Sequence, residues 1–318
     1  MTTLKFDELK FEKLSCPNGC PVSDRKVVMG QDTLHELEGV FTIVTCNHCG
    51  LSRTSPRPDQ KSVGYYYPDS YRPYSIEAMK LSSTGPWGGV KKWIRSRSGK
   101  ITDYLPVDST GRLLEIGCST GKFLNAASNL GWQVEGVEFS QMAAQHAKAQ
   151  GHKVIVGQLE TVELPTDAYD VVAGWMVLEH LHNPSAVLSH LYRAMKPNGV
   201  LILSVPNFNS WSRRIFGQFW YGLQLPTHLF HFTEPSLRKT LEKQGFVRCK
   251  FRYQANVKDF VLSLSIFLKN KGCVRFSSVL RNLVKNAGLK IHLFYPVAAL
   301  TAVLKGSSRM VVIVRKPG

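Results

Sequence analysis

The last third of this 318-residue sequence contains almost no acidic side chains. Residues 201–318 hold 19 lysines and arginines but only three carboxylates, at Glu234, Glu242 and Asp259. The first 200 residues are nearly neutral, so the formal net charge of +17 resides almost entirely in residues 201–318. A region with this imbalance is expected to lie near negative charge, on a membrane, a nucleic acid or an anionic ligand.

A long apolar run is also missing. The most apolar stretch, 291–304, is interrupted by His292 and Pro296 and is shorter than the about 20 residues that a membrane span needs. Residues 1–12 are too charged for a signal peptide, and no apolar segment follows them. We therefore expect a cytoplasmic protein, with peripheral contact to the inner membrane as an alternative.

Cysteine is sparse, yet four of the seven residues are grouped. Cys16 and Cys20 form one pair, and Cys46 and Cys49 form a second pair after a gap of 25 residues. In a reducing compartment, close thiolate pairs more often bind a metal than form disulfides. Two such pairs complete the tetrahedral coordination of a structural Zn²⁺ ion, which predicts a small zinc-ribbon-like module over residues 1–55. Four reduced cysteines without a metal are the alternative.

Residues 56–110 contain no motif that carries chemistry. They combine prolines, a tyrosine run at 65–67 and a basic patch at 91–100. Tyrosines beside basic residues can stack on nucleobases or sugars, but packing between domains is the more common role of such clusters. We expect a helical, aromatic connector.

A ligand-binding pattern begins at residue 112. The apolar run 112–117 predicts a buried parallel strand, and residues 118–127 predict a turn and a helix. A second strand at 133–137 ends in Glu138, where an acidic group can bind the two hydroxyls of a ribose. The turn lacks the third glycine of dinucleotide-binding loops, and the negative charge of Glu115 would repel a pyrophosphate. The pattern therefore disfavours a dinucleotide.

The segment 114–121, Leu-Glu-Ile-Gly-Cys-Ser-Thr-Gly, resembles the first motif of the class I S-adenosylmethionine-dependent methyltransferases. Ser119 stands where that family usually has a middle glycine. Further segments resemble the family's later strands and turns, at 154–159, 169–180, 196–205 and 310–315. The resemblance implies an α/β fold with a doubly wound, Rossmann-like, mostly parallel seven-stranded sheet. Its methyltransferase core would occupy residues 111–255, and its cofactor would be S-adenosyl-L-methionine.

The resemblance also implies cofactor contacts. Glu115 is expected near the amino group of the methionine moiety, Glu138 at the ribose hydroxyls and Phe139 beside the adenine. Gln158 stands where an acidic residue is usual at the adenine. The complete set of cofactor residues implied in this way is Glu115, Gly117, Cys118, Ser119, Gly121, Glu138, Phe139, Gln158, Leu159 and Trp175.

Transfer of a methyl group to a hydroxyl needs positioning and a base, and histidine titrates near neutral pH. His180 follows the predicted fourth strand. His228 and His231 belong to the segment 226–232, which is similar to one found in bacterial methyltransferases of polysaccharide, sugar and secondary-metabolite biosynthesis. We expect this segment to cover the carboxyl ends of the strands. The three histidines are the catalytic candidates, and structural hydrogen bonds are the alternative for each.

The basic tail at 256–318 predicts helices with apolar faces at 259–268 and 277–289. Residues 291–304 predict a more apolar helix or a pair of short segments, and the closing strand follows them. Basic helices with apolar faces can lie on an anionic bilayer, each cation near the surface contributing about 1 kcal/mol. Packing of these faces on the sheet is an equally good interpretation.

These patterns predict O-methylation of a small-molecule or glycan acceptor, for example a sugar nucleotide or a lipid-linked biosynthetic intermediate. An RNA methyltransferase is a less favoured alternative, because no Asn-Pro-Pro-Tyr-like motif follows the fourth strand. A non-catalytic zinc- and cofactor-binding module is a third hypothesis. No oligomeric state is predicted.

Overall fold

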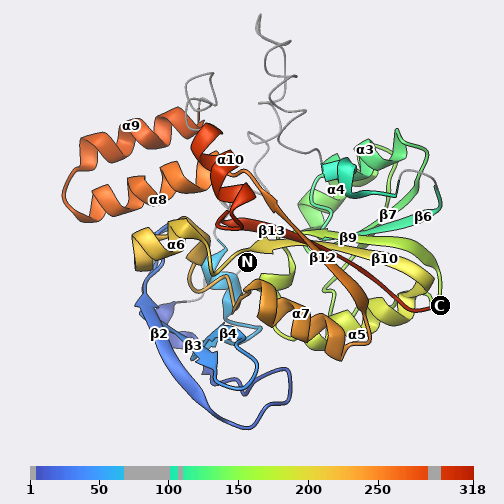
Figure 1. Ribbon diagram of the computed structural model, residues 1–318, viewed down its shortest axis with the longest axis horizontal. Helices are drawn as coiled ribbons and strands as arrows, with labels where there is room; N and C mark the ends of the chain where they lie inside the picture. Colours follow the sequence, from blue (N-terminus) through green and yellow to red (C-terminus); the bar gives the residue numbers. More distant parts are fainter. Residues whose placement is uncertain (1–4, 68–100, 107–109, 286–294) are drawn as a thin grey trace, which may run out of the picture. The chain divides into compact units, whose positions relative to one another are not determined.

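The computed structural model describes residues 5–67, 101–106, 110–285 and 295–318 (Figure 1). The chain divides into two compact units. Unit 1 comprises residues 1–68, 205–237 and 252–310, and unit 2 comprises residues 69–204, 238–251 and 311–318. Most of the predicted connector, at 68–100 and 107–109, lies outside the described residues. The predicted module boundaries stay a prediction.

A seven-stranded sheet forms the centre of unit 2, and the ends of three of its strands extend into unit 1. The strand order is β12-β13-β10-β9-β6-β7-β8, and the neighbours from β10 to β8 run parallel. This arrangement confirms the predicted Rossmann-like sheet. The strands are β6 (Arg112–Ile116), β7 (Gln133–Glu138), β8 (Lys153–Val156), β9 (Tyr169–Trp175), β10 (Met195–Pro206), β12 (Val247–Gln254) and β13 (Arg309–Arg315).

Helices cover both faces of this sheet. Figure 1 shows α3 and α4 on one side and α5 on the other. The Ser140 and Asn183 side chains cap the first turns of α4 and α5, where they accept hydrogen bonds from backbone N–H groups. The helical elements are η4 (Ile101–Tyr104), α3 (Lys122–Ser128), α4 (Gln141–Ala149), η5 (Leu178–His180), α5 (Pro184–Ala194) and α7 (Glu234–Lys243).

The N-terminal part of unit 1 is built on a four-stranded sheet of order β11-β4-β3-β2. Its strands are antiparallel: β2 (Asp24–Gly30), β3 (Phe41–Cys46), β4 (Ser52–Thr54) and β11 (Phe230–His231). β11 comes from the segment 226–232, with Phe230 opposite Arg53 and His231 opposite Ser52. The segment 226–232, which we expected to cover the carboxyl ends of the strands, thus contributes a strand to this sheet. The same sheet carries the second cysteine pair. β1 (Phe11–Glu12) and β5 (Arg57–Pro58) form a separate ribbon.

Helices make up the rest of unit 1. They are η1 (Phe6–Glu8), η2 (Val63–Tyr66), α6 (Trp211–Phe216), η6 (Gly217–Phe219), η7 (Tyr221–Leu223), α8 (Val257–Asn270), α9 (Val274–Lys285) and α10 (Tyr295–Val303). α8 and α9 form a helical hairpin (Figure 1). The predicted helices at 259–268 and 277–289 correspond to them as far as residue 285. Within the described ranges, no helix is both long and apolar enough to cross a bilayer.

A buried carboxylate lies in the core of unit 1. Asp259 of α8 is 3% exposed and accepts hydrogen bonds from Trp220 Nε1, at 3.1 Å to each of its oxygens. Burial raises the pKa of Asp259 to about 6, although hydrogen bonds from Trp220, Ser212 and Ser308 and the charge of Arg309 act in the opposite direction. Ionisation of Asp259 is therefore less favourable in the folded chain than in the unfolded chain.

The Asp259→Asn variant is expected to gain stability relative to the wild type as the pH rises. Between about pH 4 and pH 6 the folded wild type keeps a proton that the unfolded chain has released, so its free energy of unfolding falls through this window. A displacement of about two pKa units corresponds to about 3 kcal/mol. Urea unfolding of both proteins at pH 4.5, 5.5 and 7 measures the difference. A difference independent of pH contradicts the assignment, and Asp7→Asn is the control.

Candidate functional site

The turn after β6 has an unusual backbone. Gly117, Ser119 and Gly121 have positive φ angles of 63°, 47° and 81°. A side chain at Gly117 would also be obstructed, because its Cβ would lie 2.5 Å from Val177 Cγ2. These conditions explain glycine at the two ends of the turn, whereas Ser119 adopts the left-handed conformation at some energetic cost.

Glu138, at the end of β7, ties this turn in place. Its two carboxylate oxygens accept hydrogen bonds from the backbone N–H groups of Ser119 and Ser140, each at 2.8 Å. The side chain is buried, and this burial raises its pKa, although the hydrogen bonds from Ser140, Ser119 and Phe139 act in the opposite direction. The residue predicted to bind ribose thus also organises the first motif.

Glu115 is a second buried carboxylate, and it is incompletely paired. It is 3% exposed, and its Oε2 has no hydrogen-bond partner within the described part of the chain. Burial raises its pKa well above the ordinary value, and the negative charge of Glu138 adds to this effect, while the Leu124 backbone N–H lowers it. A cation or a hydrogen-bond donor of a ligand would stabilise its ionised form.

Two more buried polar atoms, which have no hydrogen-bond partner among the described residues, lie at the ends of neighbouring strands. They are Trp175 Nε1 on β9 and Ser204 Oγ on β10, which are opposite each other in the parallel register. Ligands of doubly wound sheets bind at this carboxyl edge, which also includes the end of β6. Ser204 was not predicted, and its signal in the sequence is one hydroxyl within the apolar run 200–205.

The remaining predicted cofactor residues differ in accessibility. Phe139 is 65% exposed directly after β7, so its ring is available for stacking. Cys118 is buried, and burial is the main cause of its raised pKa. A Cβ at Gly136 would lie 2.5 Å from Cys118 Sγ, which explains this glycine in the middle of a strand. Leu159 is buried after β8, and Gln158 is half-buried beside it.

The three candidate histidines differ in burial. His180 is half-buried at the end of η5, shortly after β9. His228 is 1% exposed, and its Nδ1 donates a hydrogen bond to the Gly222 carbonyl oxygen at 2.9 Å. His231 is also buried. A catalytic role of each histidine stays a prediction, and accessibility favours His180.

The tautomer of His231 follows from its partner Thr54. The Thr54 hydroxyl donates its one proton to the His228 carbonyl oxygen at 2.9 Å, so it accepts from Nε2–H of His231 at 3.1 Å. Burial, together with the positive charge of Arg213, lowers the pKa of His231 to about 3. This histidine is therefore neutral near pH 7 and connects β11 to β4.

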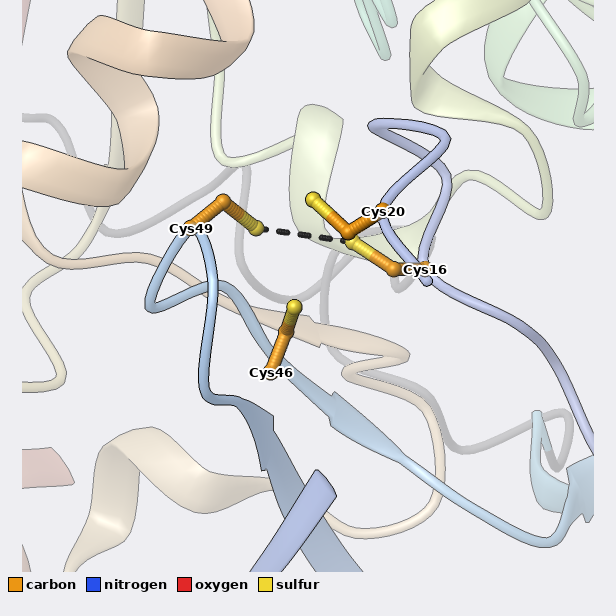
Figure 2. A group of neighbouring side chains, drawn as sticks. All are labelled: Cys16, Cys20, Cys46 and Cys49. Carbon is orange, nitrogen blue, oxygen red and sulfur yellow. Dashed lines mark hydrogen bonds between the residues drawn. The ribbon is translucent and has the colours of Figure 1, made fainter. Parts of the chain in front are cut away.

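The four cysteines of the two predicted pairs converge (Figure 2). All four sulfur atoms lie within 4.8 Å of one another, and Sγ of Cys16 is 3.4 Å from Sγ of Cys49. Tetrahedral Zn²⁺ with Zn–S bonds of about 2.3 Å requires S···S separations of about 3.8 Å. The donor set and its spacing therefore fit zinc.

The backbone around the cysteines forms two tight turns. Gly19 N–H donates to the Cys16 carbonyl oxygen and Gly50 N–H to that of Cys46, and both glycines have positive φ. Burial raises the pKa of Cys16. At Cys49 burial is outweighed by hydrogen bonds from the Leu51 backbone and the Asn18 amide, so its pKa is lowered. Cys49 is thus the thiolate that this protein environment stabilises most clearly.

Similar structures identify the fold alone. A phosphoethanolamine N-methyltransferase 2 of Haemonchus contortus, in complex with S-adenosyl-L-methionine, is 17% identical with a TM-score of 0.50, covering 93% of this chain and 69% of that chain. The [4+2]-cyclase SpnF is 16% identical with a TM-score of 0.50, covering 82% of this chain and 97% of its own. Because these two proteins carry different reaction names, this fold by itself does not decide the chemistry.

Sequence relatives are more specific. A probable S-adenosylmethionine-dependent methyltransferase of Mycolicibacterium smegmatis is 29% identical over 160 residues, which are 48% of this chain and 59% of that protein. A ubiquinone biosynthesis O-methyltransferase of Maricaulis maris is 34% identical over 149 residues, 42% of this chain and 58% of that protein. The chain thus spans less than two thirds of the length of either relative.

The match to a family model covers the region around the turn after β6. Residues 91–248 match the family described as methyltransferase domain. This span includes Glu115, Glu138 and the strands β6 to β10. This region of the chain is therefore a methyltransferase domain of the S-adenosylmethionine-dependent type.

Proposed function

We propose that the protein transfers the methyl group of S-adenosylmethionine to an oxygen atom of a small-molecule or glycan-type biosynthetic intermediate. The observation that carries the proposal is the pair of buried carboxylates, Glu115 and Glu138, at the ends of adjacent parallel strands. Sequence relatives named O-methyltransferases of ubiquinone biosynthesis support oxygen as the acceptor atom.

The residues present fit the cofactor. Its methionine moiety has an ammonium group, which would supply the missing partner of Glu115 Oε2. Glu138 would bind the ribose hydroxyls, and the exposed ring of Phe139 would stack on the adenine. When bound, the cofactor supplies an activated methyl group. The protein's own task is then to orient the acceptor, exclude water and accept a hydroxyl proton, for which His180 is our candidate.

S-adenosylhomocysteine is expected to bind the wild type, and Glu138→Ala is expected to weaken its binding by about 10- to 100-fold. Loss of hydrogen bonds to a charged group has this magnitude. Isothermal titration measures it, with Gln133→Ala at the exposed start of β7 as the control and circular dichroism as the test of folding. Equal affinity of wild type and Glu138→Ala, or no binding by the wild type, contradicts the proposal.

Once an acceptor is identified, His180→Gln should lower kcat without changing the affinity for S-adenosylhomocysteine.

We also propose that Cys16, Cys20, Cys46 and Cys49 hold one structural Zn²⁺ ion. The converging sulfur atoms and the two glycine turns support a site closed by four protein ligands, which leaves no position for water or substrate. The ion would connect the loop before β2 with the loop between β3 and β4. Its role would be to hold the N-terminal sheet together.

The purified protein is expected to contain one zinc ion per chain by elemental analysis. Cys46→Ser should reduce the zinc content and the melting temperature, because binding energy at a structural site contributes to folding. Cys273→Ser removes an exposed cysteine outside the cluster and should change neither quantity. A wild type that lacks zinc after growth with zinc, or a Cys46→Ser variant that retains it fully, overturns the assignment.

We propose further that α9 contacts an anionic membrane surface, where a lipid-linked acceptor would be found. One face of α9 packs against α8. Leu280 and Val284 share an apolar cluster with residues of α8, and the buried Ser277 forms a hydrogen bond with Ser265 of α8. Other residues of the helix remain exposed, with Phe276 72% and Val279 56% accessible. Arg275 and Lys271, which are close to them in sequence, are exposed as well. An apolar face with basic neighbours matches an interfacial helix.

Sedimentation with vesicles measures this contact. Binding to phosphatidylglycerol vesicles is expected to exceed binding to phosphatidylcholine vesicles and to fall with salt. Phe276→Ser should weaken it by about 10-fold, since burial of one large apolar side chain contributes about 1.5–3 kcal/mol. Val22→Ser, at an exposed apolar residue of the N-terminal part, is the matched control. Equal binding of the two variants, or none by the wild type, contradicts the contact.

A further inference from the structure

Arg213 in α6 carries a charge that no described residue neutralises. Its guanidinium carbon lies 4.5 Å from the centroid of the Phe208 ring, in a cation–π contact. Its Nε is buried without a hydrogen-bond acceptor, and within the described ranges no carboxylate forms an ion pair with it. Burial lowers its pKa, and the neighbouring charge of Arg214 lowers it further. The guanidinium is thus partly desolvated, and no carboxylate among the described residues forms an ion pair with it.

Two fully buried arginines of unit 1 have anionic partners. Arg53 forms an ion pair with Asp24 at 2.6 Å, and Arg57 forms one with Glu12 at 2.7 Å. Desolvation of a cation is costly unless an anion offsets it. The half-buried Arg213 therefore differs from Arg53 and Arg57, because no described carboxylate forms an ion pair with it.

Several groups around Arg213 contact one another. The ring of Phe208 lies 5.2 Å from that of His231, and the Phe208 N–H donates to the Phe232 carbonyl oxygen at 2.8 Å. His231 is neutral near pH 7, as shown above. The Ser210 side chain caps α6 by accepting from the Arg213 N–H at 3.2 Å. A guanidinium held in this manner is preorganised for a ligand.

We propose that Arg213 binds an anionic oxygen group, a carboxylate or a phosphate, of the methyl acceptor. The two terminal nitrogens of a guanidinium match the paired oxygens of either group. In chain order α6 begins five residues after the end of β10, and ligands of doubly wound sheets bind beyond the carboxyl ends of the strands. The assignment of the anion to the acceptor rests on the proposed function, whereas the anion site itself does not.

The experiment uses the full chain and simple anions as probes. Melting temperatures are measured with about 50 mM inorganic phosphate or acetate, each against chloride at equal ionic strength. A specific anion should raise the melting temperature of the wild type by about 2–4 °C over chloride. Arg213→Gln should lose this increment, and Arg214→Gln, which removes an exposed neighbouring charge, should keep it. Preference for phosphate or for acetate separates the two chemistries.

A second measurement does not depend on whether Arg213→Gln folds. In wild-type protein labelled with ¹⁵N-arginine, the Nε–H signal that is absent from Arg213→Lys should shift on titration with the preferred anion. Equal anion increments in wild type and Arg213→Gln, no increment with either anion, or an unmoved Nε–H signal overturns the proposal. Cofactor and turnover are not involved, so failure here is distinguishable from failure of S-adenosylhomocysteine to bind.

Discussion

The burial of two carboxylates at the ends of neighbouring strands is the constraint on which the cofactor region depends. Glu138 satisfies its oxygens with the backbone N–H groups of Ser119 and Ser140, and this fixes the turn that follows β6. Glu115 lacks such compensation at Oε2 and lies close enough to Glu138 for their charges to interact. Stability and ligand binding are thus connected, because a cationic ligand would offset the cost of burying the Glu115 carboxylate.

In unit 1, strand pairing and hydrogen bonds connect segments that are far apart in the sequence. β11 adds to the edge of a sheet that is otherwise formed by residues 24–54, and Thr54 holds both His228 and His231 through hydrogen bonds. The two histidines therefore contribute to the integrity of this sheet whatever else they do. The same unit contains the cysteine cluster, the buried Asp259 and Arg213, whose Nε has no hydrogen-bond acceptor among the described residues.

Local sequence was sufficient for much of the methyltransferase domain. The apolar run at 112–117, the glycine turn and the acidic end of the next strand each depend on contacts within about 30 residues, and β6, α3 and β7 lie where they were predicted. The two cysteine pairs and their glycine turns were equally readable, because each turn is a local structure. Residues whose importance comes from a missing partner, such as Ser204 and Arg213, were not found, since a sequence does not show which polar atoms become buried.

The sequence by itself determined the type of sheet, the cofactor class and the location of the positive charge. Only the tertiary structure decided that residues 230–231 pair with β4, about 180 positions earlier. It also decided which charges lose contact with water, as at Asp259 and Arg213. The physical reason is that secondary structure and turns follow from neighbours in the chain, whereas desolvation and strand pairing depend on segments that meet only after folding.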